Sequence, residues 1–199
     1  MANRPHLVTH GPAAPRAVVL LLHGGGADSL AAAPRGVAYL RMLPFGWAAA
    51  RPGVAVWRLR YRYRGWNEPE RHPVADTRWA LDRAAREHPG VPVLLVGHSM
   101  GGRVALHVAT DPGVAGICAL APWIEPPDHG LPTRPDRPLL IAHGDRDRIT
   151  DPAASARFAA GHGGRFELVR GDDHTMLRRW RTWNRLVAAF VAAFVAAPL

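Results

Sequence analysis

The chain has 199 residues, a formal net charge of +9 and one cysteine, Cys118. This length predicts a single domain over residues 1–199, large enough to bury a sheet between helices. A lone cysteine excludes a disulfide-stapled fold. The basic residues are arginines throughout the chain, without a lysine. Arginines alternate with aromatic residues between Arg58 and Arg64, as they do on some nucleic-acid-binding surfaces. Because arginine replaces lysine along the whole chain, this pattern indicates a general preference for arginine rather than a phosphate-binding patch, and we expect no nucleic-acid partner.

No stretch of the sequence predicts a secretory signal or a membrane span. The first apolar run, Ala17 to Leu22, is short and leads into His23 and three glycines, which favours a strand over a signal peptide. The apolar run from Leu186 to Leu199 is shorter than the roughly 20 residues that cross a bilayer. We therefore expect a cytoplasmic protein.

Short, nearly continuous apolar runs alternate with segments of helical character, which is typical of a parallel sheet covered by helices on both faces. The expected strands are His6 to Thr9 at an edge, Ala17 to His23, Val54 to Tyr61, Val91 to Gly97, Gly116 to Ala121, Pro138 to His143 and Arg165 to Val169. The expected helices are Asp76 to Glu87, Ser99 to Thr110, Pro152 to Ala160 and Met176 to Ala196. The predicted fold class is α/β, with a mostly parallel central sheet of about six to seven strands.

The motif Gly97-His98-Ser99-Met100-Gly101 lies between a predicted strand and a predicted helix. A serine in this position sits on a sharp turn, and the flanking glycines remove side chains that would collide where the strand and the helix approach. Its hydroxyl would point outward at the positive end of a helix, where developing negative charge is stabilised. We predict that Ser99 is a nucleophile.

A serine nucleophile needs a base, and eleven histidines compete for that role. His174 follows the last predicted strand and would reach the same edge of the sheet as Ser99. His98 adjoins Ser99 but should point away from it and support the turn. His23 and His143 end strands, where they are expected to orient loops. His174 is the predicted base.

The base needs a carboxylate, and the sequence His143-Gly144-Asp145-Arg146-Asp147 offers two candidates after a strand. Asp151 is a third candidate, but its place before Pro152 is that of a helix cap. Asp145, directly after a glycine, is suited to stabilising the turn. Asp147 is favoured, and Asp145 remains the alternative.

The glycine run Gly24-Gly25-Gly26 ends the first buried strand and could aim backbone N–H groups at an oxyanion. We expect Gly25 and Gly24 to contribute to this oxyanion hole, together with the amide of Met100. A glycine turn can also hold phosphate. Here it is followed by neither a Gly-Lys-Ser/Thr ending nor a Gly-x-Gly-x-x-Gly spacing, so nucleotide binding is weakly supported.

From Ala17 onward the sequence resembles the α/β-hydrolase superfamily. The resemblance rests on the serine motif, the His23-Gly24-Gly25 turn, the His143 to Asp147 loop and the chain order Ser, Asp, His. In this family the acid usually stands third after the His-Gly pair, which also selects Asp147. The segment Tyr63-Arg64-Gly65-Trp66 looks like the Arg-Gly loop that often follows the next strand in such enzymes.

The favoured function is a serine hydrolase that cleaves a carboxylic ester or thioester through an acyl-enzyme, without metal or cofactor. Its partner would be a small-molecule acyl substrate. The alternatives are acyl transfer, amide or carbon–carbon bond cleavage on the same triad, or a non-catalytic receptor that keeps the pocket.

The short connection from Ala121 to Pro138 leaves little room for a cap, so we expect an open, shallow site that prefers short or medium acyl groups. The loops near the strand ends would supply its walls. The substrate-pocket residues expected there are Tyr63, Trp66, Trp123, Ile124 and Met176.

Overall fold

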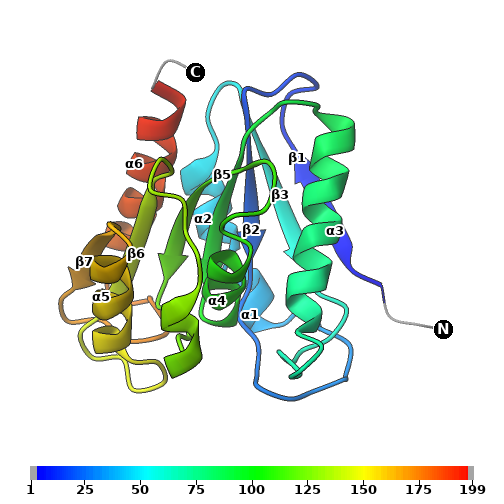
Figure 1. Cartoon of the computed structure of the whole chain (residues 1–199). Helices are drawn as coiled ribbons and strands as arrows, with labels where there is room; N and C mark the ends of the chain where they lie inside the picture. Colours follow the sequence, from blue (N-terminus) through cyan, green and yellow to red (C-terminus); the bar gives the residue numbers. More distant parts are fainter. Residues whose placement is uncertain (1–3, 197–199) are drawn as a thin grey trace.

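The computed structural model describes residues 4–196, and a sheet of seven strands runs through its centre (Figure 1). The strand order is β1-β3-β2-β4-β5-β6-β7, and β1 alone is antiparallel to its neighbour. The strands are β1 (His6–His10), β2 (Ala17–Leu22), β3 (Val54–Arg60), β4 (Val93–His98), β5 (Val114–Leu120), β6 (Leu139–Gly144) and β7 (Arg165–Val169). The predicted fold class and all seven strands are confirmed, with ends that shift by one or two residues.

Within residues 4–196, five α-helices and one 3-10 helix lie between strands, and a sixth α-helix follows the last strand. They are α1 (Val37–Leu40), α2 (Leu43–Ala49), α3 (His72–Glu87), α4 (Met100–His107), the 3-10 helix η1 (Pro126–Gly130), α5 (Pro152–Gly161) and α6 (Trp180–Ala196). The helices α1 and α2 were not predicted from the sequence. The predicted start of the last helix at Met176 is wrong, because that residue has a φ of 59° and the helix starts at Trp180.

The helices form a layer on each face of the sheet because its middle strands are apolar on both sides. On one face, α3, α4 and α5 share a core with alternate residues of the strands, such as Leu20 of β2, Trp57 of β3 and Ile141 of β6, and α5 lies over β6 and β7. This layer lies in front of the sheet in Figure 1. On the other face, α2 and α6 pack together and cover the residues of opposite parity, such as Leu21 and Leu94.

The parallel strands share a direction, so their carboxyl ends meet at one edge, toward the bottom of Figure 1. The loops that follow β2, β4, β6 and β7 all emerge there. Ligand sites of open α/β sheets lie at this edge. Within residues 4–196, no helix is long and apolar enough to cross a membrane.

Candidate active site

Ser99 occupies the sharp turn between β4 and α4, with a φ of 57° that is unusual for a residue other than glycine. A Cβ on Gly97 would lie 2.2 Å from the carbonyl oxygen of Gly101, and a Cβ on Gly101 would lie 2.2 Å from that of Leu22. Only glycine therefore fits at these two positions, as the motif predicted. The amide of Ser99 donates to Leu120 O at 3.0 Å, which ties the turn to the neighbouring strand.

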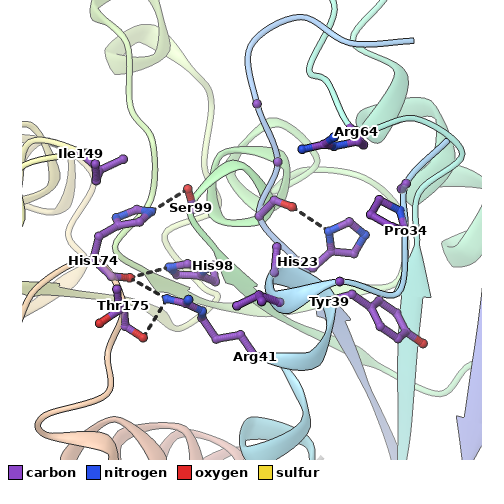
Figure 2. Close-up of a pocket in the computed structure, with 17 residues that line it drawn as sticks. His23, Pro34, Tyr39, Arg41, Arg64, His98, Ser99, Ile149, His174 and Thr175 are labelled. Atoms are coloured by element: carbon purple, nitrogen blue, oxygen red, sulfur yellow. Dashed lines mark hydrogen bonds between the residues drawn. The ribbon is translucent and has the colours of Figure 1, made fainter. Parts of the chain in front are cut away.

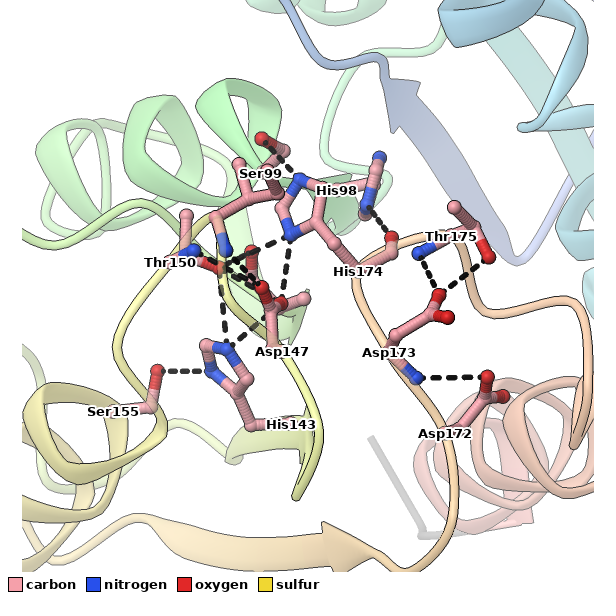
Figure 3. A network of polar contacts seen from close by, with 12 residues as sticks. His98, Ser99, His143, Asp147, Thr150, Ser155, Asp172, Asp173, His174 and Thr175 are labelled. Atoms are coloured by element: carbon pink, nitrogen blue, oxygen red, sulfur yellow. Dashed lines mark hydrogen bonds and ion pairs between the residues drawn. The ribbon is translucent and has the colours of Figure 1, made fainter.

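Ser99, His174 and Asp147 form a hydrogen-bonded chain across three loops (Figure 3). His174 Nδ1 donates to Asp147 Oδ2 at 2.7 Å, so Nε2 is left as the acceptor for the Ser99 hydroxyl at 3.0 Å. The structure thus brings together the three residues in the expected order. An imidazole held this way can take a proton from a serine hydroxyl.

Asp147 lies at the centre of a dense set of donors. Its Oδ2 also accepts from His143 Nε2 at 3.1 Å and from Thr150 Oγ1 at 3.0 Å, while its Oδ1 accepts the amides of Ile149 and Thr150. Burial alone would raise the pKa of this carboxyl, but the hydrogen bonds from His143, His174 and the two amides hold it well below its usual range. The carboxylate is therefore ionised at any pH where the protein would work.

His143 makes a second imidazole contact to Asp147 that the sequence did not reveal, although a loop-orienting role was expected. Its side chain is fully buried, and its Nδ1 lies 2.8 Å from the hydroxyl of Ser155 on α5. Because Nε2 donates to the carboxylate, Nδ1 accepts from Ser155 when the ring is neutral. His143 thereby connects the carboxylate to α5.

The loop that carries His174 is fixed by contacts on both sides. His98 Nε2 donates to His174 O at 3.1 Å, so His98 contacts the loop of the predicted base, whereas the sequence predicted a role in supporting the Ser99 turn. Burial lowers the pKa of His98 to about 3, which keeps its ring neutral.

The two other candidate acids make contacts away from the base. Asp145, the alternative acid, accepts the amide of Gly171 at 2.7 Å and so joins the loops after β6 and β7. Asp151 caps α5 by accepting the amide of Ala153, as predicted.

The glycine turn lies against the serine turn. A Cβ on Gly24 would contact the Cβ of Ser99 at 3.2 Å, and a Cβ on Gly25 would collide with the Met100 side chain. His23 Nε2 accepts the Tyr61 amide, so Nδ1 carries the proton and donates to Gly24 O at 2.7 Å. This bond fixes the peptide plane that joins the two glycines. In the described part of the chain, no recorded hydrogen bond uses the amides of Gly25 or Met100.

A cavity of about 720 Å³ opens beside Ser99 and His174 (Figure 2). Its volume falls within the range of small-molecule sites. One wall comes from residues 33–41, which cover the loop before α1, α1 itself and Arg41; Ile149 and Thr175 line the opposite side. This wall could not be predicted from the sequence, because the segment carries no periodic apolar pattern and no motif.

The five residues expected as pocket walls do not line this cavity. Trp66 and Trp123 instead both pack against the buried Arg103 guanidinium, whose central carbon lies 4.3 and 4.5 Å from their ring centres. Ile124 is buried in the core beneath α4, and Met176 in the core on the other face. Tyr63 packs edge-on against His72. These side chains are used for packing, because Arg103 and the sheet faces need apolar or aromatic cover.

Two contacts from unexpected residues complete the site. Arg41 donates to the carbonyl oxygens of Thr175 at 2.8 Å and His174 at 3.4 Å, which fastens the wall to the loop of the base (Figure 2). Thr150 Oγ1 lies 3.1 Å from His174 Nδ1. Thr150 could have been suspected, since aspartate often accepts amides two and three residues ahead in a turn. No sequence signal pointed to Arg41.

The family comparison agrees with this geometry. A family model described as an alpha/beta hydrolase domain matches residues 15–192. The chain belongs to the α/β-hydrolase family. No curated protein matches this α/β-hydrolase in sequence.

Solved structures resemble this α/β-hydrolase over nearly its whole length. A serine hydrolase without a lid from Xanthomonas campestris aligns with a TM-score of 0.78 and 17% identity, covering 98% of this chain and 91% of the other. Est1E from Butyrivibrio proteoclasticus, solved with ferulic acid, aligns at 0.75 and 15%, covering 97% and 96%. A monoacylglycerol lipase from Paleococcus ferrophilus aligns at 0.68 and 16%, covering 96% and 99%. At these identities the likeness establishes the shared fold.

Proposed function

We propose that this α/β-hydrolase cleaves a carboxylic ester or thioester through an acyl-enzyme formed on Ser99. The observation that carries the proposal is the chain of hydrogen bonds from Asp147 through His174 to Ser99, with the hydroxyl beside a cavity of small-molecule size. A nucleophile, its base and an orienting carboxylate in this order are what acyl transfer requires. The similar fold of a monoacylglycerol lipase from Paleococcus ferrophilus supports an ester substrate.

In the proposed reaction, Ser99 Oγ attacks the acyl carbon while His174 Nε2 accepts the hydroxyl proton. Asp147 stabilises the imidazolium that forms and keeps its Nδ1 proton pointed inward. The amides of Gly25 and Met100 would stabilise the oxyanion, with Gly24 beside them packed against Ser99. His174 then gives its proton to the leaving oxygen or sulfur, and water releases the acyl group by the same steps in reverse order.

Two observations support this role: within residues 4–196 neither amide has a hydrogen-bond acceptor, and the peptide that carries the Gly25 amide is held in place. His23 holds Gly24 O, and the N–H of Gly25 points the opposite way in the same trans peptide. Burial lowers the pKa of His23 to about 4, so this contact persists with a neutral ring. The turn is thus arranged before substrate arrives, which is how electrostatic stabilisation lowers a barrier.

A fluorophosphonate probe tests the proposal directly. We expect the wild-type protein to be labelled at Ser99, located by peptide mass spectrometry, and the Ser99→Ala variant to remain unlabelled. Ser29→Ala, in the loop after the glycine turn, is the matched control and should label like wild type. A folded wild-type protein that does not react would instead favour the non-catalytic receptor.

Steady-state assays on p-nitrophenyl esters and acyl thioesters of graded chain length complete the test. The Ser99→Ala variant should lose on the order of 10³-fold or more in kcat. Near wild-type turnover by purified Ser99→Ala would contradict the assignment of the nucleophile. Transfer of the acyl group to an added alcohol or amine in preference to water would identify an acyltransferase.

A further inference from the structure

The cavity beside Ser99 is lined by positive but not by negative side chains. Among residues 4–196, its lining includes two arginines, Arg41 and Arg64, and neither an aspartate nor a glutamate. The carboxylate of Asp147 lies behind His174, is fully buried and is paired with two imidazoles. The low pKa values of His23 and His98 leave those two lining histidines neutral. The charge that faces the cavity space is therefore that of the arginines.

The two arginines differ in how many of their guanidinium N–H donors are free to bind a ligand. Arg41 is half-buried and uses its guanidinium to hold the carbonyl oxygens of His174 and Thr175. Arg64 is exposed, and within the described chain its side chain has neither a salt bridge nor a hydrogen bond. Figure 2 shows it on the far side of the glycine turn from His174, above His23. Arg64 is thus a cation with unused donors at a substrate cavity.

The backbone of Arg64 is fixed even though its side chain is free. Its amide donates to Ala31 O at 3.0 Å, and its carbonyl oxygen accepts the amide of Gly26 at 3.0 Å. A Cβ on Gly25 would lie 2.3 Å from that carbonyl oxygen. The Arg64 side chain therefore extends from a fixed backbone next to Gly25, one of the proposed oxyanion donors, and lines the same cavity as Ser99.

We propose that Arg64 is a specificity-determining residue that binds an anionic group of the substrate, a carboxylate or a phosphate. The substrate class is then an ester or thioester that also carries a free anion, a few bonds from the scissile carbonyl. The planar guanidinium can bind such an anion with two parallel hydrogen bonds, whereas the apolar wall formed by Pro34, Val37 and Ala38 accepts the neutral part of the molecule. This inference rests on the proposed hydrolase function.

Pairs of substrates that differ in one ionisable group test the inference. On the acyl side, p-nitrophenyl hydrogen adipate is compared with its methyl ester. On the alcohol side, 4-acetoxybenzoate and 4-acetoxyphenyl phosphate are compared with methyl 4-acetoxybenzoate, which separates carboxylate from phosphate. We expect the wild-type kcat/KM for at least one anion to exceed that for its neutral partner by about tenfold at low salt, and the advantage to shrink at high salt.

Variants then assign the effect to one side chain. Arg64→Gln should bring the ratio of anionic to neutral kcat/KM to within about twofold of one, and Arg64→Lys should restore part of it because it keeps the charge without the planar fork. The matched control is Arg148→Gln, which removes one positive charge from an exposed site beside Ile149 without changing the cavity lining. This control should keep the wild-type ratio. Because the Arg64 backbone makes its fixed contacts, the Arg64 variants should fold normally, which circular dichroism checks.

The outcomes are separable from those of the hydrolase assignment. Turnover of the neutral esters with no preference for any anion, or a preference that Arg64→Gln leaves intact, would overturn the anion site and leave the hydrolase in place. An equal loss of preference in Arg148→Gln would also overturn it, because the effect would then be one of general charge. If wild type hydrolyses none of these esters and Ser99 does not react with the phosphonate probe, the proposed function itself is wrong.

Discussion

The two sides of the cavity are built in opposite ways. On one side lies the acid–base network, which consists of His143, Asp147, Thr150 and His174 and is held by buried hydrogen bonds. On the other lies the wall segment, residues 33–41, whose side chains are mostly small or apolar and partly exposed. Val37, for example, is 71% exposed although it lines the cavity.

The difference follows from what each side has to do: the acid–base network must hold a precise geometry for the reaction, whereas the wall segment only has to fit the substrate. Proton transfer needs donor and acceptor atoms within a few tenths of an ångström of a fixed geometry, so each member of the network has several partners. An apolar wall only needs the right shape and can change residue by residue at small cost. We therefore expect substitutions in the network to lower kcat strongly, and substitutions in the wall to change selectivity mildly.

Among substitutions that leave Ser99 in place, the largest effect should follow Asp147→Asn. The amide cannot stabilise the His174 imidazolium, and its NH₂ group would compete for the position of the Nδ1 proton. We expect kcat to fall on the order of 10²-fold or more, with KM little changed. Asp145→Asn is the matched control, because Asp145 contacts the Gly171 amide rather than the base. Equal losses in the two variants, measured in the same ester assay, would place the acid elsewhere.

The pH profile should show a single acidic limb. Asp147 stays ionised because its pKa is held below the usual range, and His98 and His23 stay neutral because burial lowers their pKa values to about 3 and about 4. None of these three groups should change charge near neutral pH, so a loss of activity on acidification would report the general base, which must start neutral. The value of kcat/KM should fall tenfold per pH unit on that limb. A rate that does not fall at any acidic pH at which the protein stays folded would contradict general-base catalysis.

A smaller effect should follow the loss of the second imidazole on Asp147. His143→Phe removes the donor at 3.1 Å while keeping much of the buried volume, and we expect kcat to fall roughly tenfold. His143→Gln can still donate to the carboxylate and should recover part of this loss. His143 acts through Asp147 as a positioning residue, so KM should move far less than kcat. If Phe and Gln give the same rate, the contact with Asp147 has no catalytic consequence.

The smallest effect is expected in the wall segment. Val37→Ala removes two methyl groups from the cavity lining, each worth at most about 0.8 kcal/mol and less here because the side chain is exposed. The ratio of kcat/KM for hexanoyl and acetyl p-nitrophenyl esters should change by roughly threefold or less. A larger change would show that Val37 becomes buried when substrate binds.

The acid–base network and the wall segment also differ in how far the sequence predicts them. The turn around Ser99 has a backbone conformation that only a few residue patterns permit, so Gly97 and Gly101 identify it, and the order of strands places Asp147 and His174 at the same edge. The seven strands follow from their apolar runs. The Ser99 turn and the strands could be predicted from short stretches of sequence, because local steric limits and the burial of apolar side chains determine their structure.

The sequence could not predict features that depend on distant partners. Trp66 and Trp123 were expected at the pocket, yet they lie against Arg103, a contact between segments far apart in the chain. The helices α1 and α2 are too short for a periodic pattern, and α1 makes no side-chain cap. Arg41 donates a hydrogen bond to the carbonyl oxygen of Thr175, which lies 134 positions later in the chain. Such pairings become visible only when the whole sheet is assembled.

The hydrogen bonds from Arg41 to the loop that carries His174 couple the motion of that loop to the motion of α1. The guanidinium bridges two connections that follow different strands, so a swing of α1 away from the cavity must either break two hydrogen bonds or draw the His174 backbone with it. Local opening of residues 37–41 and of residues 172–176 is then one cooperative event rather than two. Amide protons on both segments would exchange with solvent at a common opening free energy. Substrate entry and the placement of the base are thereby linked through a single side chain.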